Sequence, residues 1–302
     1  MRKDEVVVGL AEVAQPVDAV EPAGHNQPAR RRLDVQMAWW SMTGLGDGDR
    51  EWSLEEKFER IAAAGFTGIF GGVPAAAERE QWSRLMDEYG FSFATGGFPR
   101  SAADLAVTLE EAREFGASYV NSQVLDSFVT GEDAIRLLGE LDAEAEKFGI
   151  PHYVETHRGR ITQDLLRTVD YVRELPQLKL TIDFSHYIVA GEMDGFVKDY
   201  EQEAETYFDV LLQRASCIHG RVSNGQQVQV GLADEDQLDR FSVWWAKGMA
   251  YWLESAAPGA SFPFVCELGP APYELAGRSA ERFAESVRLK ERAEAIWASV
   301  AR

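Results

Sequence analysis

The sequence is poor in cysteine and in positive charge. Of its 302 residues only two are cysteine, Cys217 and Cys266, and both lie in apolar runs. Buried, reduced thiols of this kind are typical of a cytoplasmic protein and argue against a disulfide framework. The 30 lysines and arginines are outnumbered by 50 aspartates and glutamates, which gives a net charge of −20. Because nucleic-acid binding needs a basic surface, no nucleic-acid partner is expected.

Long hydrophobic runs are missing as well. The apolar run at residues 6–11 is too short to cross a bilayer and is followed at once by Glu12, so neither a signal peptide nor a membrane partner is expected. Residues 1–32 contain three prolines and show no hydrophobic periodicity. This composition predicts a flexible N-terminal arm at residues 1–32, followed by one domain at residues 33–302.

From residue 33 onward, short apolar runs alternate with segments of helical periodicity. The predicted strands are residues 33–42, 67–73, 91–98, 118–124, 152–155, 180–183, 216–219 and 262–267. The predicted helices are residues 53–65, 75–89, 101–116, 132–148, 165–175, 200–215, 234–255 and 280–301. Eight strands alternating with eight helices predict an α/β fold, a single-domain (β/α)8 TIM barrel. A doubly wound sheet also alternates, but no glycine-rich phosphate turn follows the first strand.

The stretch at residues 151–187 predicts where the chemistry of this barrel lies. Two short apolar runs, 152–155 and 180–183, flank a helical segment, which is the pattern of a βαβ unit. A right-handed crossover brings the C-terminal ends of both strands to the same edge of the sheet. Glu155 and Asp183 end these two strands, so we expect them to be neighbours although they are distant in the sequence.

The last two predicted strands also end in residues that bind metals, His219 and Glu267. In a (β/α)8 barrel the strand ends meet at the C-terminal mouth, where active sites lie. Three carboxylates and an imidazole brought together there would repel and lose solvation unless a cation neutralised them. Three oxygen donors and one nitrogen donor suit octahedral Mn²⁺, Mg²⁺ or Co²⁺ better than structural Zn²⁺. The sequence therefore predicts one divalent metal ion, with Mn²⁺ as first choice.

The four residues lie in motifs that resemble those of a known superfamily. The motifs VETH, IDFSH, CIHGR and VCELG are similar to the metal-binding motifs of the sugar phosphate isomerase/epimerase superfamily, which has a xylose-isomerase-like TIM barrel. It includes ketose 3-epimerases and hydroxypyruvate isomerase, and the resemblance covers residues 33–302. It implies that Glu155 and Glu267 are metal ligands and also acid/base residues on opposite faces of the substrate carbon. It implies that Asp183 and His219 complete the metal site.

The resemblance also suggests two substrate-binding residues. His186 follows Asp183 in the pattern D-x-x-H, and in the epimerases this histidine binds a substrate oxygen. The alternative for His186 is a loop histidine with ordinary hydrogen bonds. Arg221, two residues after His219, resembles a substrate-binding arginine, although the spacing in the family is often longer.

Two further groups of candidate substrate-binding residues come from the sequence. Where ketose epimerases tend to carry a second acidic residue, this chain has the basic segment HRGR at residues 157–160, which contains His157 and Arg158. The segment could bind a carboxylate, a phosphate or a polarised oxygen, or it could balance the acidic rim. Trp39 and Trp40, at the end of the first predicted strand, could form an apolar wall for a sugar or aglycone. Alternatively they pack within the barrel, since one of two adjacent strand residues must face outward.

The leading functional prediction is a metal-dependent isomerase or epimerase of carbohydrate metabolism. A metal that chelates a carbonyl and its neighbouring hydroxyl lowers the pKa of the α C–H and stabilises the cis-enediolate that forms when a carboxylate removes the proton. Return of the proton to another carbon isomerises a small keto or aldo sugar, or a related acid. Return of the proton from the opposite face epimerises the same substrate.

Three other functions remain alternatives. A lyase or deglycosidase would cleave 3-keto-glycosides, including C-glycosides, by the same proton abstraction followed by elimination, often beside a small partner subunit. A base-excision endonuclease would need more than the five histidines present and a basic face. A scaffold protein would leave the complete ligand set unexplained. A homo-oligomer is a further prediction, because the segment at 234–255 contains Trp244, Trp245 and Trp252, although aromatics on barrel helices usually pack inward.

Overall fold

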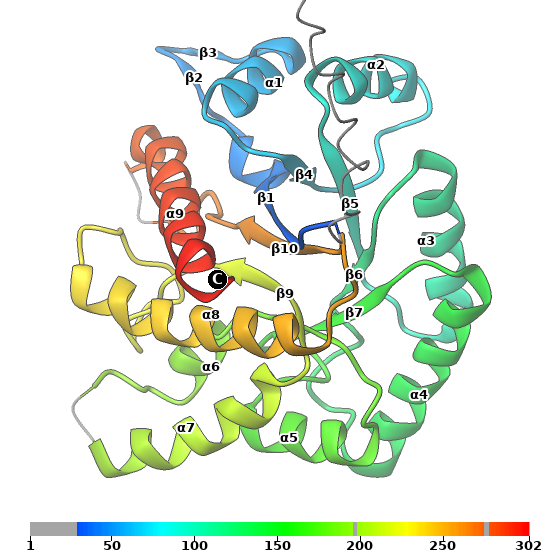
Figure 1. The fold of residues 1–302 in the computed structure, drawn as a ribbon, viewed down its shortest axis with the longest axis vertical. Helices are drawn as coiled ribbons and strands as arrows, with labels where there is room; N and C mark the ends of the chain where they lie inside the picture. Colours follow the sequence, from blue (N-terminus) through cyan, green and yellow to red (C-terminus); the bar gives the residue numbers. More distant parts are fainter. Residues whose placement is uncertain (1–28, 196–197, 275–277, 302) are drawn as a thin grey trace, which may run out of the picture.

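The computed structural model describes residues 29–195, 198–274 and 278–301, and these form a closed barrel of parallel strands surrounded by helices (Figure 1). The barrel order is β1, β4, β5, β6, β7, β8, β9 and β10, and β1 pairs with both β10 and β4 to close the ring. The predicted single-domain (β/α)8 TIM barrel is confirmed. Its helices lie outside the strands. Because the barrel strands are parallel, their C-terminal ends all meet at one mouth of the barrel.

The element bounds are as follows. The barrel strands are β1 (Arg32–Ala38), β4 (Gly68–Phe70), β5 (Ser92–Gly97), β6 (Val120–Ser122), β7 (His152–Glu155), β8 (Leu180–Ile182), β9 (Ala215–Gly220) and β10 (Ser261–Cys266). The helices are α1 (Leu54–Ala63), α2 (Arg79–Tyr89), α3 (Ala102–Phe115), α4 (Gly131–Phe148), α5 (Leu165–Glu174), α6 (Ser185–Ala190), α7 (Lys198–Leu212), α8 (Glu235–Ser255) and α9 (Ser279–Val300). A small hairpin, β2 (Gly46–Asp47) and β3 (Arg50–Glu51), follows the short 3-10 helix η1 (Trp39–Met42).

The beginning of the barrel differs from the sequence prediction. Strand β1 starts at Arg32, the last residue assigned to the arm, and residues 1–28 of that arm lie outside the described residues. The first strand ends at Ala38 instead of continuing to residue 42, because the chain turns into η1. Arg282 of α9 stabilises this turn by donating from Nε to the carbonyl oxygen of Ser41 over 2.7 Å. The turn that ends the strand is therefore contacted by a residue from the far end of the chain.

The helix boundaries follow from local sequence chemistry. Ser53 and Glu56 form the predicted capping box at the start of α1, with each side chain bound to the other residue's backbone N–H. Gly149 ends α4 in the left-handed conformation, φ 69°, which glycine adopts without steric cost. These signals explain why most predicted helix ends agree with the structure to within a few residues.

Helix α8 packs inward against the barrel. Trp244 and Trp245 are buried, and Trp252 packs against Phe262 at a ring distance of 5.2 Å. These tryptophans therefore contribute to the core of the barrel, and the homo-oligomer stays a prediction. Cys217 and Cys266 are buried free thiols, as expected.

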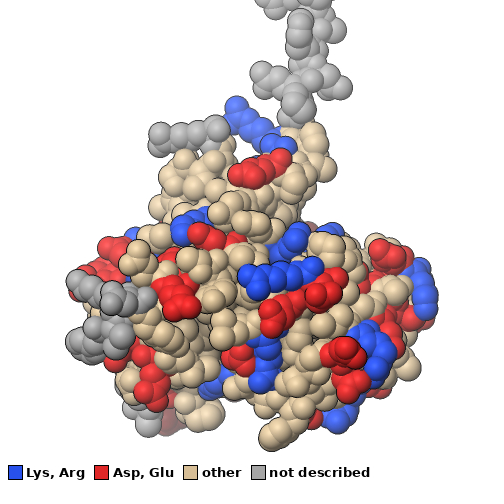
Figure 2. Space-filling model, turned by 90° about the horizontal axis from the view of Figure 1, so that it is seen from below, with Lys and Arg blue, Asp and Glu red and all other residues tan. Residues whose placement is uncertain are grey.

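Charged side chains on the outside of the molecule are mixed in sign. On the face seen in Figure 2, lysines and arginines are interspersed with aspartates and glutamates and form no continuous basic stripe. Within the described residues, no helix is both long enough and apolar enough to cross a membrane.

A buried histidine at the start of β7 makes folding stability sensitive to acid. His152 Nε2 lies 2.8 Å from Ser122 Oγ, and burial lowers the pKa of His152 to about 4. Below pH 6.5 His152 takes up a proton in the unfolded chain but stays neutral in the folded protein. The free energy of unfolding therefore falls as the pH drops toward 4. Between pH 7 and pH 5 this residue is expected to remove roughly 2 kcal/mol of the free energy of unfolding.

Urea unfolding of wild type and His152→Asn at both pH values measures this contribution, because the other histidines act alike in both proteins. The wild type should lose more stability than the variant between pH 7 and pH 5. Equal losses would show that His152 is protonated in the folded protein.

Candidate functional site

Four buried side chains meet at the C-terminal mouth of the barrel. Glu155 is the last residue of β7, Asp183 follows β8, His219 lies near the end of β9 and Glu267 follows β10. Each is at most 6% exposed. The parallel register of β7 to β10 places these positions side by side, and for Glu155 and Asp183 the βαβ pattern predicted this.

Three of the four form a tight group. Glu155, His219 and Glu267 each offer a ligand atom, and these atoms lie within 4.8 Å of one another. His219 Nδ1 is 2.9 Å from Glu267 Oε2 and 3.7 Å from Glu155 Oε2. Asp183 lies outside this group, because the guanidinium of Arg221 is inserted beside it. Arg221 Nη2 is 2.7 Å from Glu267 Oε2 and 3.7 Å from Asp183 Oδ2.

The donor atoms of the group fit a divalent cation. Buried atoms that make no hydrogen bond include Asp183 Oδ2, Glu267 Oε2 and both ring nitrogens of His219. The 2.9 Å approach of His219 to Glu267 is an ion-pair distance, but the two groups are not aligned for a hydrogen bond. Buried polar atoms without hydrogen bonds are costly, and a metal ion could be ligated by the carboxylate oxygens and by one ring nitrogen of His219. Carboxylate oxygens with an imidazole nitrogen are suitable ligands for Mn²⁺, Mg²⁺ or Co²⁺.

Two amides that the sequence analysis missed hold Glu155 in place. Asn121 donates from Nδ2 to Glu155 Oε2 over 2.5 Å, and Gln123 donates from Nε2 to Glu155 Oε1 over 3.1 Å. Both residues come from the end of β6 or directly after it. The signal in the sequence was the pair of amides, two positions apart, within the predicted strand at residues 118–124. Alternate strand positions face the same side, so both side chains reach the barrel mouth.

The two glutamates have opposite pKa shifts. Burial raises the pKa of Glu155 to about 7, with the negative charges of Glu267 and Asp183 adding to it against the opposing effect of His219. Burial also acts to raise the pKa of Glu267, but His219 and Arg221 outweigh it and lower this pKa to about 2. Considering protein groups alone, one carboxyl can therefore hold a proton near neutral pH while the other stays ionised.

The two remaining histidines of the site lie against each other. The rings of His157 and His186 have centroids 3.8 Å apart. Burial lowers the pKa of His157 to about 3 and lowers the pKa of His186 well below its ordinary value. A nitrogen from each ring and an oxygen of Glu155 also lie within 4.8 Å of one another. Arg158 contacts both histidines, so the basic segment at residues 157–160 is part of the site.

A cavity of about 590 Å³ opens over these residues. Its lining includes Glu155, Glu267, His157, Arg160 and Arg221 on the polar side. The aromatic side includes Trp39, Trp40, Phe70, Phe98 and Tyr273. Both tryptophans line the cavity, because η1 frees them from the alternation of a strand. A side chain on Gly269 would overlap the ring of Trp40, so this glycine makes room for the wall.

Tyr273 is a cavity residue that the sequence analysis did not single out. It follows β10 in an irregular loop, where no periodicity marks it. Its ring lies 4.7 Å from the Arg221 guanidinium carbon and 5.3 Å from the ring of Trp40. Tyr273 therefore links the cationic and aromatic sides of the cavity.

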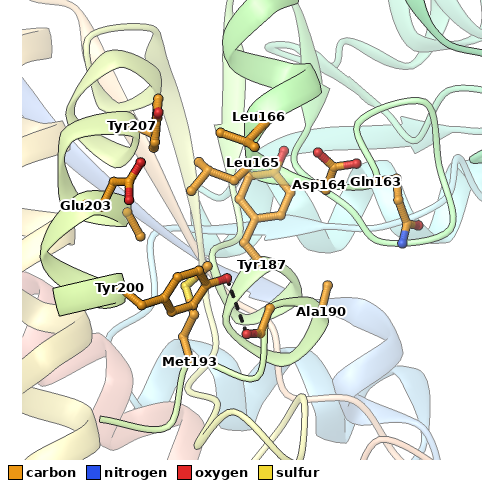
Figure 3. A pocket seen from close by; sticks show the side chains of 12 residues that line it. Gln163, Asp164, Leu165, Leu166, Tyr187, Ala190, Met193, Tyr200, Glu203 and Tyr207 are labelled. Carbon is orange, nitrogen blue, oxygen red and sulfur yellow. Dashed lines mark hydrogen bonds between the residues drawn. The ribbon is translucent and has the colours of Figure 1, made fainter. Parts of the chain in front are cut away.

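A second cavity, of about 330 Å³, lies outside the barrel between α5, α6 and α7 (Figure 3). Three tyrosines line it, Tyr187, Tyr200 and Tyr207, and Tyr200 donates from its hydroxyl to the carbonyl oxygen of Gly191 over 3.4 Å. It shares no lining residue with the cavity over the strand ends.

Comparisons with known proteins agree with this architecture. Two solved structures are similar to the chain, each with a TM-score of 0.54. One is the probable 3-DHS dehydratase AsbF, involved in petrobactin synthesis, from Bacillus anthracis, at 12% identity over 87% of this chain and 98% of that one. The other is an L-ribulose 3-epimerase, at 13% identity over 89% of this chain and 94% of that one. At these identities the likeness shows the fold alone.

No curated protein sequence matches the chain. The family model described as xylose isomerase-like TIM barrel matches residues 58–219, which is more than half of the sequence and includes Glu155, Asp183 and His219. The chain therefore belongs to the xylose isomerase-like TIM barrel family.

Proposed function

We propose that the protein is a divalent-metal-dependent isomerase or epimerase of a small keto or aldo sugar or a sugar-derived substrate. The observation that carries the proposal is the group of Glu155, His219 and Glu267 at the barrel mouth, with Asp183 beside it across Arg221, where Glu155 and Glu267 line the large cavity. Bound there, a divalent ion would polarise a substrate carbonyl and its neighbouring hydroxyl. Mn²⁺ is the ion that we propose first, with Mg²⁺ and Co²⁺ as alternatives.

The protein groups at this mouth support proton transfer. Glu155 and Glu267 are two carboxyl groups whose surroundings drive their pKa values apart, which is the arrangement of an acid/base pair. The amides of Asn121 and Gln123 fix the direction of the Glu155 carboxylate. One of the two, as a carboxylate, removes a proton from the carbon next to the substrate carbonyl, and the other, as a carboxylic acid, returns a proton to the same carbon or its neighbour.

Arg221 supports binding of a substrate oxygen. Its Nε donates to the carbonyl oxygen of Glu267 over 3.0 Å, and its Nη2 pairs with the carboxylate of the same residue. Its Nη1 is buried and has no hydrogen-bond partner, although the residue lines the cavity. An oxygen of the substrate would satisfy this donor.

The aromatic wall favours a second candidate function. Trp39, Trp40, Phe70 and Phe98 give the cavity a large apolar side, and Phe98 is 65% exposed. Such a wall suits a planar apolar group beside the sugar. A lyase that releases an aglycone from a 3-keto-glycoside, by proton abstraction and elimination, would use it. With either function we also propose that the protein is cytoplasmic and acts in carbohydrate metabolism. For the lyase we propose in addition a small partner subunit.

Metal analysis and a substrate screen test both functions. The purified protein should bind about one divalent ion per chain, and Asp183→Ala should lose it, while Asp170→Ala on the surface of α5 should keep it. Keto sugars and 3-keto-glycosides are then incubated with Mn²⁺ in deuterated water and scored for isomer, deuterium in the substrate and free aglycone. Isomer with deuterium supports the first function, and free aglycone supports the second. Three zinc ions per chain, with neither product, would support an endonuclease instead.

A further inference from the structure

The cavity between α5, α6 and α7 is lined by two carboxylates, those of Asp164 and Glu203. Among the residues that the structure describes, no lysine or arginine lines it. Asp164 already has a cationic partner, because Arg167 Nε donates to Asp164 Oδ2 over 2.6 Å. The negative charge that remains for a ligand is therefore that of Glu203.

Glu203 differs from the two glutamates nearest to it on α7. Glu201 pairs with Arg240 over 3.0 Å, and a carboxylate oxygen of Glu205 lies 3.5 Å from Lys247 Nζ. Glu203 is exposed, lines the cavity and forms no ion pair with any residue in the described part of the chain. Figure 3 shows its carboxylate on the α7 side of the cavity. A carboxylate in this position is available to a cationic ligand.

The hydroxyl protons of two tyrosines in the lining are already used. Tyr187 donates to Thr168 Oγ1 over 2.7 Å, and Thr168 in turn donates to the carbonyl oxygen of Asp164 over 2.8 Å. Tyr200 donates to the carbonyl oxygen of Gly191 (Figure 3). Each phenol has a single proton, so the oxygens of Tyr187 and Tyr200 can only accept further hydrogen bonds.

Side-chain acceptors therefore outnumber side-chain donors around this cavity. The acceptors are the two carboxylates and the two phenol oxygens, whereas the described donors that remain are the Gln163 amide and the Tyr207 hydroxyl. A ligand group that only accepts, such as a carboxylate or a phosphate, would find few partners. An ammonium group has three donors and no acceptor, and it also supplies the charge that Glu203 lacks.

The rest of the lining is apolar and reaches the surface. Leu165, Leu166, Ala190 and Met193 contribute to it, and Leu166 and Tyr200 are 56% and 45% exposed. Exposed apolar side chains gathered around a concave site are typical of ligand binding. The volume of about 330 Å³ is at the lower end of the range for small-molecule sites. The ligand that fits therefore has a small apolar body.

We propose that this cavity binds a protonated amine that has an apolar or aromatic body. The ammonium group pairs with Glu203 and lies near the rings of Tyr200 and Tyr207, which attract cations. The apolar body packs against Leu165 and Leu166. This site is separate from the barrel mouth and does not depend on the proposed isomerase or lyase activity.

The cavity at the barrel mouth could also attract an amine, because it too combines carboxylates with aromatic rings. A test must therefore distinguish the two cavities. Tyrosines line both of them, with Tyr187, Tyr200 and Tyr207 in the smaller cavity and Tyr273 in the larger one. Fluorine NMR of the full chain labelled with 3-fluorotyrosine reads both cavities at once. The sequence has nine tyrosines, and single Tyr→Phe variants assign the signals.

Three probes of similar shape and different charge test the ligand class. Benzylamine, which is cationic at neutral pH, should shift the signals of Tyr200 and Tyr207 at lower concentration than it shifts Tyr273. Benzyl alcohol should bind about fivefold more weakly, because it lacks the charge that pairs with Glu203. Benzoate should leave these two signals unchanged. Equal binding of benzyl alcohol, binding of benzoate, or a shift of Tyr273 alone would overturn the proposal.

Two variants locate the binding of benzylamine. Glu203→Gln should weaken it about fivefold and leave benzyl alcohol unaffected. Ala190→Leu, which places a larger side chain in the cavity, should abolish the shifts of Tyr200 and Tyr207 while the signal of Tyr273 stays in place.

Glu174→Gln is the matched control, because Glu174 is an exposed carboxylate at the other end of α5 and does not line the cavity. It should bind benzylamine as the wild type does. Wild-type affinity in Glu203→Gln, or the same loss in Glu174→Gln, would contradict the assigned site. Glu203→Gln changes one exposed side chain, so its result decides the question even where Ala190→Leu disturbs the fold.

Discussion

Glu155→Gln and Glu267→Gln are each expected to slow solvent-proton exchange into the substrate by roughly 10²–10⁴-fold, the usual contribution of a general acid or base. Glutamine keeps the shape of glutamate but cannot remove or return a proton. The two glutamates are buried in one group with His219, and among the described residues this group contains no third carboxyl group. Deuterium incorporation, measured by mass spectrometry with the substrate found in the screen, gives the rate.

Glu146→Gln is the control for both variants, because Glu146 is an exposed residue of α4. It should exchange protons at the wild-type rate. Circular dichroism and urea unfolding establish that Glu155→Gln and Glu267→Gln remain folded. Wild-type exchange in either folded variant would refute the role assigned to that glutamate.

Arg221→Gln is expected to lower the free energy of unfolding of the metal-free protein by about 3–5 kcal/mol, the usual cost of removing one partner from a buried ion pair. Arg221 is 1% exposed, and its guanidinium lies between Glu267 and Asp183. Its loss leaves Asp183 without its ion-pair partner and leaves Glu267 with His219 as its remaining cation. Urea unfolding in the presence of a chelator measures the effect.

Adding Mn²⁺ should restore more stability to Arg221→Gln than to the wild type, because the ion supplies the positive charge that the variant lacks. Arg292→Gln is the control, since Arg292 pairs with Glu235 and Asp239 on the surface, where such pairs contribute up to about 1 kcal/mol. If Arg221→Gln cost no more than this control, Arg221 would not be the counter-ion of the site.

The barrel could be predicted from sequence because its signals are local. Alternating apolar runs, the capping box at Ser53 and the helix stop at Gly149 each depend on a few neighbouring residues. The end of the first strand could not be predicted in this way. Arg282 binds the turn at Trp39–Met42. The residues next to the turn in the sequence do not indicate that contact.

The site was predictable to the extent that it lies at strand ends. Parallel strands bring their C-terminal residues together, so Glu155 and Asp183 could be placed side by side from their positions alone. The insertion of Arg221 between Asp183 and Glu267 depends on side-chain packing, which spacing does not encode. Tyr273 was missed because it lies in a loop without periodicity, and its position is defined only by the rings and cations around it.

The anchoring of η1 by Arg282 also determines when the aromatic wall can form. The hydrogen bond from Arg282 to Ser41 joins residues 241 positions apart, and Arg282 Nη1 lies 2.8 Å from Glu274 Oε1 in the loop that contains Tyr273. During synthesis, the segment with Trp39 and Trp40 leaves the ribosome long before α9 exists. Closing a loop of this length costs conformational entropy. The wall that would face the substrate is thus among the first segments made, and it cannot gain this anchor until nearly the whole chain has been synthesised.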